Sequence, residues 1–155
     1  LFACSGIMFN HESNLRPERF VTRKICKAAA RIALGSNEIL ELGDIAIKRD
    51  WGWAPEYVYA MWKMLQQKKA DDFVIATGYL DTLSEFINNA FSSLNLNWEN
   101  HVKSNSNFYR PSEIRSVHGC SEKASKELNW HAEKMMPEIA QLMSYYEFEK
   151  LKDKK

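Results

Sequence analysis

Apolar residues recur at intervals of three and four positions along several segments of the chain, which is the spacing of amphipathic helices. The segment 20–34 shows this spacing most clearly, and Gly35 follows at a position where helices commonly end. We therefore expect a helix over 20–34. Its buried face is expected to consist of Val21, Ile25, Ala29, Ile32 and Ala33.

The same spacing predicts two more helices in the middle of the chain. Pro55 suits the first turn of a helix, and Thr82 with Glu85 has the pattern of a capping box that opens a helix over 82–94. In the helix that follows Pro55, we expect four apolar residues to lie in the core: Val58, Met61, Trp62 and Leu65.

Short β-rich runs alternate with these helices. Residues 38–42 and the run "DFVIATG" are predicted strands, and a weaker strand is expected near 101–105. The opening run "LFACSGIMF" is predicted to be a buried strand that needs neighbouring strands. A small helix near 121–128 and a last helix near 137–151 complete an alternation that is typical of α/β or α+β packing.

The composition favours one globular domain over residues 1–155, with 45% hydrophobic and 26% charged residues. The 21 Lys and Arg residues barely exceed the 20 Asp and Glu residues, so we expect no nucleic-acid partner. The opening apolar run is too short to span a bilayer, and we expect no membrane association. The three cysteines lie far apart without C-x-x-C spacing, which favours a reducing, cytoplasmic location.

The first candidate binding site is the start of the helix over 20–34. Arg23 and Lys24 fall in its first turn, where the helix dipole disfavours cations. A bound anion such as a phosphate would compensate by using both the side chains and the free backbone N–H groups. The alternative is a solvated basic face made of Arg23, Lys27 and Arg31.

Two further segments combine cations with aromatic residues. In "KRDWGWAPEYV", Lys48 and Arg49 lie beside two tryptophans, either as the rim of a ligand site or as a packed loop with a structural Arg–Asp pair. In "FYRPSEI", Pro111 favours an extended backbone at Arg110, and Glu113 offers a carboxylate to a base or a sugar hydroxyl. The sequence has no G-x-S-x-G, H-E-x-x-H or G-x-G-x-x-G motif, and no His spacing typical of a metal site. No intrinsic catalytic group is therefore predicted.

Seven segments in order resemble the GDP-mannose 4,6-dehydratase family of extended short-chain dehydrogenase/reductases. They are "GIMFNHES", "FVTRKI", "RIALG", "LGDIAIKRDWGWAPEYVYAMWKMLQQ", "DFVIATG", "YRPSEI" and "KELNW". The resemblance implies an α/β chain that forms the C-terminal part of such a Rossmann-type fold, including its small substrate-binding domain. Most of the N-terminal cofactor domain would be missing.

The resemblance also implies a reaction. In that family NADP accepts a hydride from C4 of the mannose of GDP-mannose, water is eliminated across C5 and C6, and the hydride returns to C6 to give the 4-keto-6-deoxy sugar. The family's glycine-rich loop, its Thr and Glu acid/base residues and its Tyr-x-x-x-Lys pair lie upstream of the part resembled. The catalytic residues are therefore expected before Leu1, and the chain alone is expected to be inactive.

The binding residues follow by position within the matched segments. By resemblance, His11 and Arg16 contact NADP and Asn10 faces the sugar diphosphate. The GDP-binding wall would consist of Val21, Lys24, Arg49, Arg110 and Glu113. The family's Ser-Pro-Arg-Arg-Gly turn is replaced here by "SNLRPE", which keeps Arg16 in a different backbone setting.

The resemblance leaves two alternatives to the dehydratase. One is a nucleotide-sugar epimerase or reductase of the same superfamily, and the other is a non-catalytic module that binds nucleotide sugars. The acid/base residues upstream would distinguish them. A homo-oligomer is expected for the full-length protein.

Overall fold

The structure is a computed structural model that describes residues 1–109, 112 and 114–153. Its helices are α1 (Val21–Ala33), α2 (Ala54–Leu65), α3 (Leu83–Ser92), α4 (Glu122–Leu128) and α5 (Met136–Lys152), with short 3₁₀ turns η1 (Trp98–Asn100) and η2 (Ser106–Phe108). Its strands are β1 (Gly6–Met8), β2 (Asn10–Glu12), β3 (Leu40–Leu42), β4 (Lys48–Arg49), β5 (Trp51–Trp53), β6 (Phe73–Ile75), β7 (Asp81–Thr82), β8 (Val102–Ser104) and β9 (Ser116–Val117).

The strands pair mostly in parallel, across long sequence separations. β1 pairs with β6, β2 with β5, β3 with β8, and β4 lies between β7 and β9. Among the strands of the described residues, only the β4–β7 pair is antiparallel. The alternation of helices with parallel strands confirms the α/β class.

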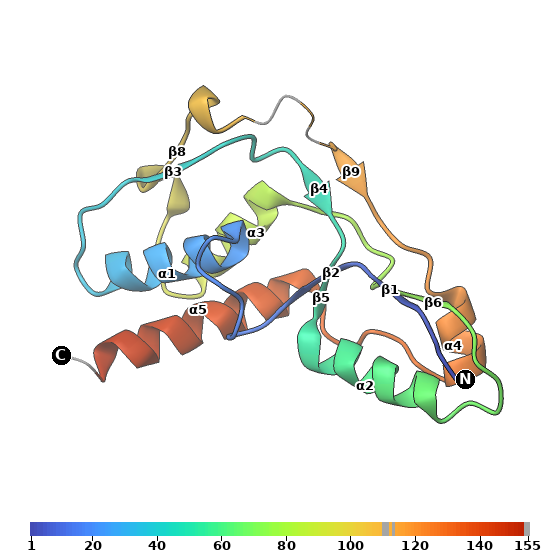
Figure 1. Cartoon of the computed structure of the whole chain (residues 1–155). Coiled ribbons are helices and arrows are strands. Elements are labelled where there is room, and N and C mark those ends of the chain that lie inside the picture. Colours follow the sequence, from blue (N-terminus) through green and yellow to red (C-terminus); the bar gives the residue numbers. More distant parts are fainter. Residues whose placement is uncertain (110–111, 113, 154–155) are drawn as a thin grey trace.

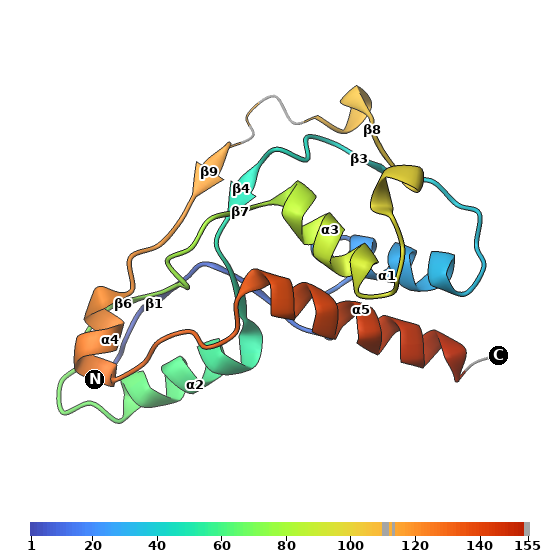
Figure 2. The ribbon, with the colours of Figure 1, turned by 180° about the vertical axis from the view of Figure 1, so that it is seen from behind.

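Two hydrophobic clusters divide the chain into regions that Figures 1 and 2 show from opposite sides. The α1 region contains α1, α3 and α5 with β3, β5 and β8, and its core includes Ile25, Phe86 and Ile139. The α2 region contains α2, α4, β1 and β6, and its core includes Tyr57 and Trp130. The N-terminus lies in the α2 region and α5 ends at the far side of the α1 region (Figure 1).

The helix predicted over 20–34 is confirmed as α1. Ile25, Ala29 and Ile32 are buried against α3 and α5, while Val21 and Ala33 are partly buried. Gly35 has φ of +100°, a left-handed conformation that costs glycine little, and its N–H donates to the carbonyl of Ile32 at 2.9 Å. The apolar spacing thus identified both the helix and its packed face.

The predicted starts of α2 and α3 are also confirmed. Pro55 lies in the first turn of α2. At α3, the Glu85 N–H donates to the Thr82 hydroxyl at 3.1 Å, and the Thr82 N–H donates to the Glu85 carboxylate at 2.7 Å, which completes the capping box.

The expected buried face of α2 is wrong. Val58, Met61, Trp62 and Leu65 are 60%, 43%, 55% and 61% exposed. The helix packs instead through Tyr57, Ala60 and Met64, toward α4 and β6. α2 is apolar on both sides, so the helical spacing alone did not decide which side the chain itself would cover.

The opening strand exists as β1, but the predicted burial is wrong for the described residues. Phe2 is 44% exposed and Ile7 is 54% exposed. β1 pairs along one edge with β6, and no other described strand pairs with it. With a single neighbour, β1 is an edge strand in the described part of the chain, and its exposed side chains show that its face is only partly covered.

The longest described helix, α5, has 17 residues and packs Ile139, Ala140 and Met143 into the α1 region. None of the described helices is both long enough and apolar enough to cross a membrane.

Candidate functional site

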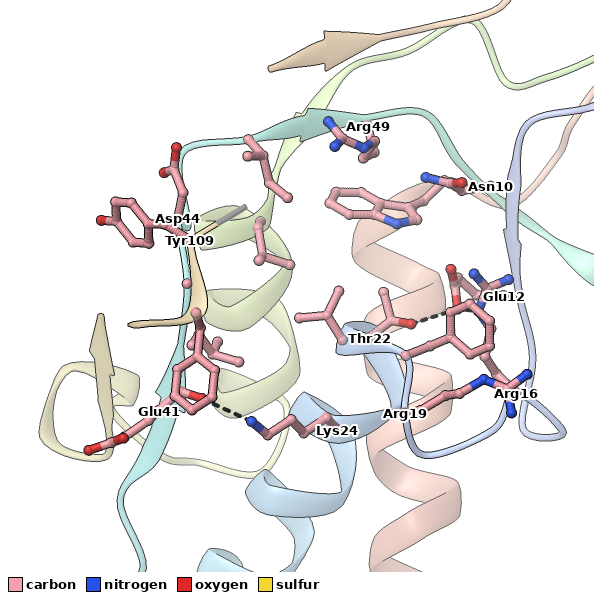
Figure 3. A pocket seen from close by; sticks show the side chains of 18 of the residues that line it. Asn10, Glu12, Arg16, Arg19, Thr22, Lys24, Glu41, Asp44, Arg49 and Tyr109 are labelled. Carbon is pink, nitrogen blue, oxygen red and sulfur yellow. Dashed lines mark hydrogen bonds and ion pairs between the residues drawn. The ribbon is translucent and has the colours of Figure 1, made fainter. Parts of the chain in front are cut away.

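A cleft of about 920 Å³ lies beside α1, between segments that are distant in the sequence. Its lining comes from residues 10–24, 41–51 and 83, and from residues 108, 109 and 115. The parallel pairing of β2 with β5 places Asn10 opposite Trp51, so the first two segments meet at one edge (Figure 3). The cleft therefore depends on tertiary pairing rather than on any local motif.

β2 sends its residues to opposite sides. Asn10 and Glu12 line the cleft, whereas His11 stacks on Tyr57 with ring centroids 5.0 Å apart, and its Nδ1 lies 2.8 Å from the Phe9 carbonyl. A Cβ on Gly52 would meet the Tyr57 ring at 2.2 Å, so glycine is required there for this stack. Asn10 and His11, predicted to face the substrate and the cofactor respectively, thus lie on different faces.

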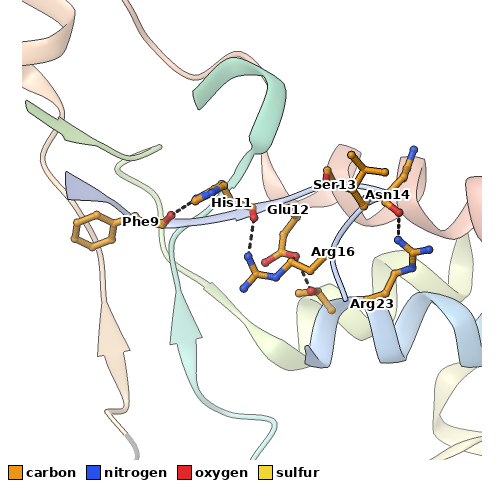
Figure 4. A network of polar contacts seen from close by, with 9 residues as sticks. Phe9, His11, Glu12, Ser13, Asn14, Arg16 and Arg23 are labelled. Carbon is orange, nitrogen blue, oxygen red and sulfur yellow. Dashed lines mark hydrogen bonds and ion pairs between the residues drawn. The ribbon is translucent and has the colours of Figure 1, made fainter. Parts of the chain in front are cut away.

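A buried carboxylate organises the entrance to α1 (Figure 4). Glu12 accepts a hydrogen bond from the Thr22 hydroxyl at 2.6 Å and pairs with Nε of Arg16 at 3.2 Å. Burial raises the pKa of Glu12, and the Thr22 hydrogen bond and the charges of Arg16 and His11 oppose that rise. Nη1 of Arg16 also donates to the His11 carbonyl at 2.9 Å, which fixes the guanidinium at the cleft.

The sequence suggested that Arg23 either binds an anion at the start of α1 or belongs to a solvated basic face, and the structure shows neither. The Arg23 side chain is buried, pairs with Glu147 of α5 and donates to the Asn14 carbonyl, so it belongs to neither an anion site nor a solvated face. Arg31 pairs with Glu38 at the surface. The carboxylate that compensates Arg23 is 124 positions away in the sequence, which is why local spacing could not reveal it.

Besides Asn10, three more predicted substrate residues line the cleft. Val21 and Lys24 do so from α1, and Nζ of Lys24 donates to the Glu41 carbonyl at 2.9 Å. Arg49 lines the cleft from β4, and together with Asn10 it also lines an adjoining pocket of about 440 Å³. Arg110 and Glu113 lie outside the described residues, so their predicted roles stay predictions.

Arg16, predicted for the cofactor, lines the same cleft as these substrate residues. It lies at the end that also holds Arg19, and its guanidinium lies 4.0 Å from the centre of the Phe20 ring. The cleft therefore contains Arg16 and Arg19 in addition to Lys24 and Arg49, the two cations predicted to bind the substrate. Arg19 was missed as a site residue because nothing local separates it from other surface arginines.

Asp50, the residue after Arg49, binds the backbone of two loops, one at residues 77–78 and one at residue 119. Its carboxylate accepts hydrogen bonds from the backbone N–H groups of Thr77 and Gly78 at 2.9 and 2.8 Å and of Gly119 at 3.3 Å. The Thr77 hydroxyl donates to it at 2.7 Å. The sequence left two alternatives for this segment, the rim of a ligand site or a packed loop with an Arg–Asp pair. In the structure Arg49 lines a cleft, and the Asp50 carboxylate accepts hydrogen bonds from backbone N–H groups. Trp51 is buried against Phe86.

Sequence reasoning missed the aromatic and acidic side of the cleft. Glu41, Asp44, Phe108 and Tyr109 line it. The β3–β8 pairing brings the 104–109 segment over 41–43, and a Cβ on Gly43 would lie 2.7 Å from the Phe108 carbonyl oxygen. The one available signal was the "FY" that opens "FYRPSEI".

One catalytic spacing occurs away from the cleft. Tyr59 and Lys63 of α2 match Tyr-x-x-x-Lys, but Nζ of Lys63 donates to the Leu128 and Asn129 carbonyls at 3.0 and 2.8 Å. Neither residue lines either pocket. The spacing therefore reflects packing of α2 on α4, and it does not supply an acid/base pair.

The fold is shared with proteins of known structure. A structure described as RMD from Pseudomonas aeruginosa complexed with NADPH superposes with a TM-score of 0.83 at 20% identity, covering 94% of this chain and 47% of that one. dTDP-glucose 4,6-dehydratase from Bacillus anthracis, in complex with NAD, superposes with a TM-score of 0.79 at 15% identity, covering 96% and 45%. The class is thus the extended short-chain dehydrogenase/reductase fold of epimerases and dehydratases, matched over about half its length.

The sequence narrows this class to one family. The GDP-mannose 4,6 dehydratase family model matches residues 1–143, and the chain belongs to that family. It is 45% identical over 143 residues to GDP-mannose 4,6 dehydratase 1 of Arabidopsis thaliana, covering 92% of this chain and 40% of the relative. It is 39% identical over 166 residues to the Homo sapiens GDP-mannose 4,6 dehydratase, covering 96% and 45%. The chain spans less than half the length of these relatives.

Proposed function

We propose that this chain supplies the GDP-mannose-binding side of a GDP-mannose 4,6-dehydratase. The observation that carries the proposal is one cleft in which Lys24, Arg49 and Arg16 converge from three separate segments. In a chain of this family, such a cleft suits a nucleoside diphosphate linked to a sugar. Arg110 and Glu113 are proposed to complete the same wall.

The diphosphate is proposed to lie among the cations near the start of α1. Phe20, the residue before the helix, makes no side-chain cap, and the first turn has no acidic residue. The first N–H groups of the helix therefore remain available to an anion. Charge-assisted hydrogen bonds from guanidinium and ammonium groups would add to them.

The cofactor is proposed to be NADP, which would accept the hydride from C4 of the mannose and return it to C6. Among the described residues, Arg16 is the one of the two predicted cofactor contacts that lines the cleft, and Glu12 and the His11 carbonyl orient its guanidinium. His11 stacks against Tyr57 and is proposed to contact NADP from the other face of β2. These residues would bind and orient, and none of them moves a proton in the proposed reaction.

The test is calorimetric titration of the full-length protein with GDP-mannose and with NADP. Arg49→Ala should weaken GDP-mannose binding by about 10- to 100-fold, because each charge-assisted hydrogen bond contributes about 1.5–3 kcal/mol. NADP binding should change little. Arg16→Ala should show the reverse pattern.

Arg31→Ala is the matched control, since Arg31 lies on the same helix and pairs with Glu38 outside the cleft. It should leave both affinities unchanged. Equal, negligible losses in the Arg49 and Arg16 variants would overturn the proposal. So would a full-length protein that neither binds nor dehydrates GDP-mannose.

A further inference from the structure

The cleft has two chemically different ends. Arg16 and Arg19 lie at the end near β2, while Glu41, Asp44 and Tyr109 lie together at the opposite end (Figure 3). The first end is basic and suits phosphates. The second end has two carboxylates and two aromatic rings, and Lys24 reaches its border, where Nζ donates to the Glu41 carbonyl. Around Asp44 and Tyr109 this end suits an uncharged ring that carries hydrogen-bond donors.

The aromatic side of this second end is well supported. The Asn105 N–H donates to the Leu42 carbonyl at 2.7 Å, and the Ser104 hydroxyl donates to the Gly43 carbonyl at 3.1 Å. These bonds hold the segment that carries Phe108 and Tyr109 against β3. Both side chains are 52% exposed, with Lys24 Nζ 5.4 Å from the centre of the Phe108 ring and the Tyr109 hydroxyl 3.2 Å from Ser104 Oγ, so part of each ring is available for stacking.

Asp44 is the carboxylate best placed to read the stacked ring. Its Oδ1 accepts the Ala46 N–H at 2.8 Å, so the loop fixes the direction of the side chain. A carboxylate can accept about four hydrogen bonds, and this one retains capacity on both oxygens. Glu41 is held differently: its Oε2 accepts the Asn105 side-chain amide at 2.9 Å, which ties this carboxylate to the segment that carries Phe108 and Tyr109.

We propose that Asp44 determines base specificity by accepting the N1–H and 2-amino hydrogens of guanine, while Phe108 and Tyr109 stack on the ring. Guanine presents two donors side by side on its pairing edge. Adenine presents an acceptor at N1, and uracil flanks its single N–H with two carbonyl oxygens, so a carboxylate faces lone pairs in both. This inference rests on the proposed function and adds the residue that selects the nucleotide.

The test is calorimetric titration of the full-length protein with GDP, IDP and ADP. IDP keeps N1–H but lacks the 2-amino group, so it isolates one of the two proposed bonds. The wild-type protein should bind GDP at least about tenfold more tightly than IDP, and IDP more tightly than ADP. This order tests the inference without any variant.

Asp44→Asn should weaken GDP binding by about 10- to 100-fold and IDP binding by less, and it should change ADP binding by roughly twofold or less. Phe108→Ala should weaken all three by about the same factor, roughly 5- to 100-fold, because stacking is tolerant of base identity. Asp153→Asn is the matched control, since Asp153 is exposed at the end of α5 and outside the cleft.

The outcomes separate this inference from the proposed function. If the wild type binds GDP and ADP equally, or if Asp44→Asn weakens all three nucleotides alike, Asp44 does not read the base, while the dehydratase proposal stands. If the wild type binds none of the three, both proposals fail together. Thermal unfolding of each variant distinguishes a lost contact from a lost fold.

Discussion

α1 and α2 carry similar apolar spacing, yet only one of the two expected faces is buried. Ile25 of α1 is fully buried, whereas Trp62 of α2 is 55% exposed. α1 packs against both α3 and α5, while α2 has α4 and β6 on one side only (Figures 1 and 2). Spacing therefore identifies an apolar face, and the presence of a partner element decides whether that face is covered.

The comparison also separates two kinds of surface. The exposed α2 face, defined as Val58, Tyr59, Met61, Trp62 and Leu65, is one continuous helix side with no described element upon it. The rings of Tyr59 and Trp62 stack on each other with centroids 5.6 Å apart, but this contact leaves most of both apolar rings exposed to water. A face of this kind is expected to associate with another apolar surface.

The largest expected effect tests the α1 region. Arg23→Ala should destabilise the fold by about 3–5 kcal/mol, because it leaves Glu147 buried without its cation. Urea unfolding followed by circular dichroism measures the loss. Arg31→Ala, which breaks a partly exposed pair with Glu38, should cost about 1 kcal/mol or less. Equal losses in the two variants would contradict the buried-pair interpretation, and Arg23→Met with Glu147→Leu should recover most of the stability.

The next largest effect tests the junction at Asp50, where its carboxylate binds the backbone at residues 77, 78 and 119. Asp50→Asn should cost about 2–3 kcal/mol, since an amide oxygen cannot accept all of the hydrogen bonds that the carboxylate receives from Thr77, Gly78 and Gly119. Amide hydrogen exchange should become faster at residues 77 and 78, ahead of α1. Uniform acceleration across the chain would show instead that the junction opens only by global unfolding.

A smaller effect concerns pH. Burial holds the pKa of Glu12 above 4.5, so the folded chain binds this proton more tightly than the unfolded chain does. The stabilisation is complete below the unfolded pKa and is lost as the pH rises through the folded pKa. Urea midpoints should therefore fall over that interval, and Glu12→Gln should flatten the slope. An unchanged slope in the variant would assign the pH dependence to other groups.

The smallest expected effect on stability lies on the exposed α2 face. Trp62→Ser should change the unfolding free energy by no more than about 0.5 kcal/mol, because the side chain is exposed. It should reduce self-association, measured by sedimentation velocity. Met64→Ser is the contrast, since Met64 is 3% exposed on the opposite side of the same helix and its loss should cost about 2–5 kcal/mol. A large loss of stability in Trp62→Ser would mean that this face is covered in solution.

Local chemistry made several elements predictable. Thr82 with Glu85, Pro55 and Gly35 each act within a single turn, so their effects on α3, α2 and α1 did not depend on distant residues. Local chemistry did not identify Lys24 and Arg49 as binding residues, since neither has a local pattern that marks a site. The resemblance to the family's segments predicted their roles, and the structure places both in the lining of the cleft.

Taken alone, the sequence determined where the helices and some of the strands form and to which family the chain belongs, because capping, apolar spacing and matched segments act over short stretches. It did not predict the short strands β2, β4, β5, β7 and β9, which exist through their pairing with distant segments. Only the tertiary structure decided that Arg23 pairs with Glu147, that Asp50 serves the backbone of two loops, and that Asp44 faces the same cleft as Arg16. Each of these depends on which strands pair and which helices pack. Charge compensation and burial act through space, and residues that are far apart along the chain supply both.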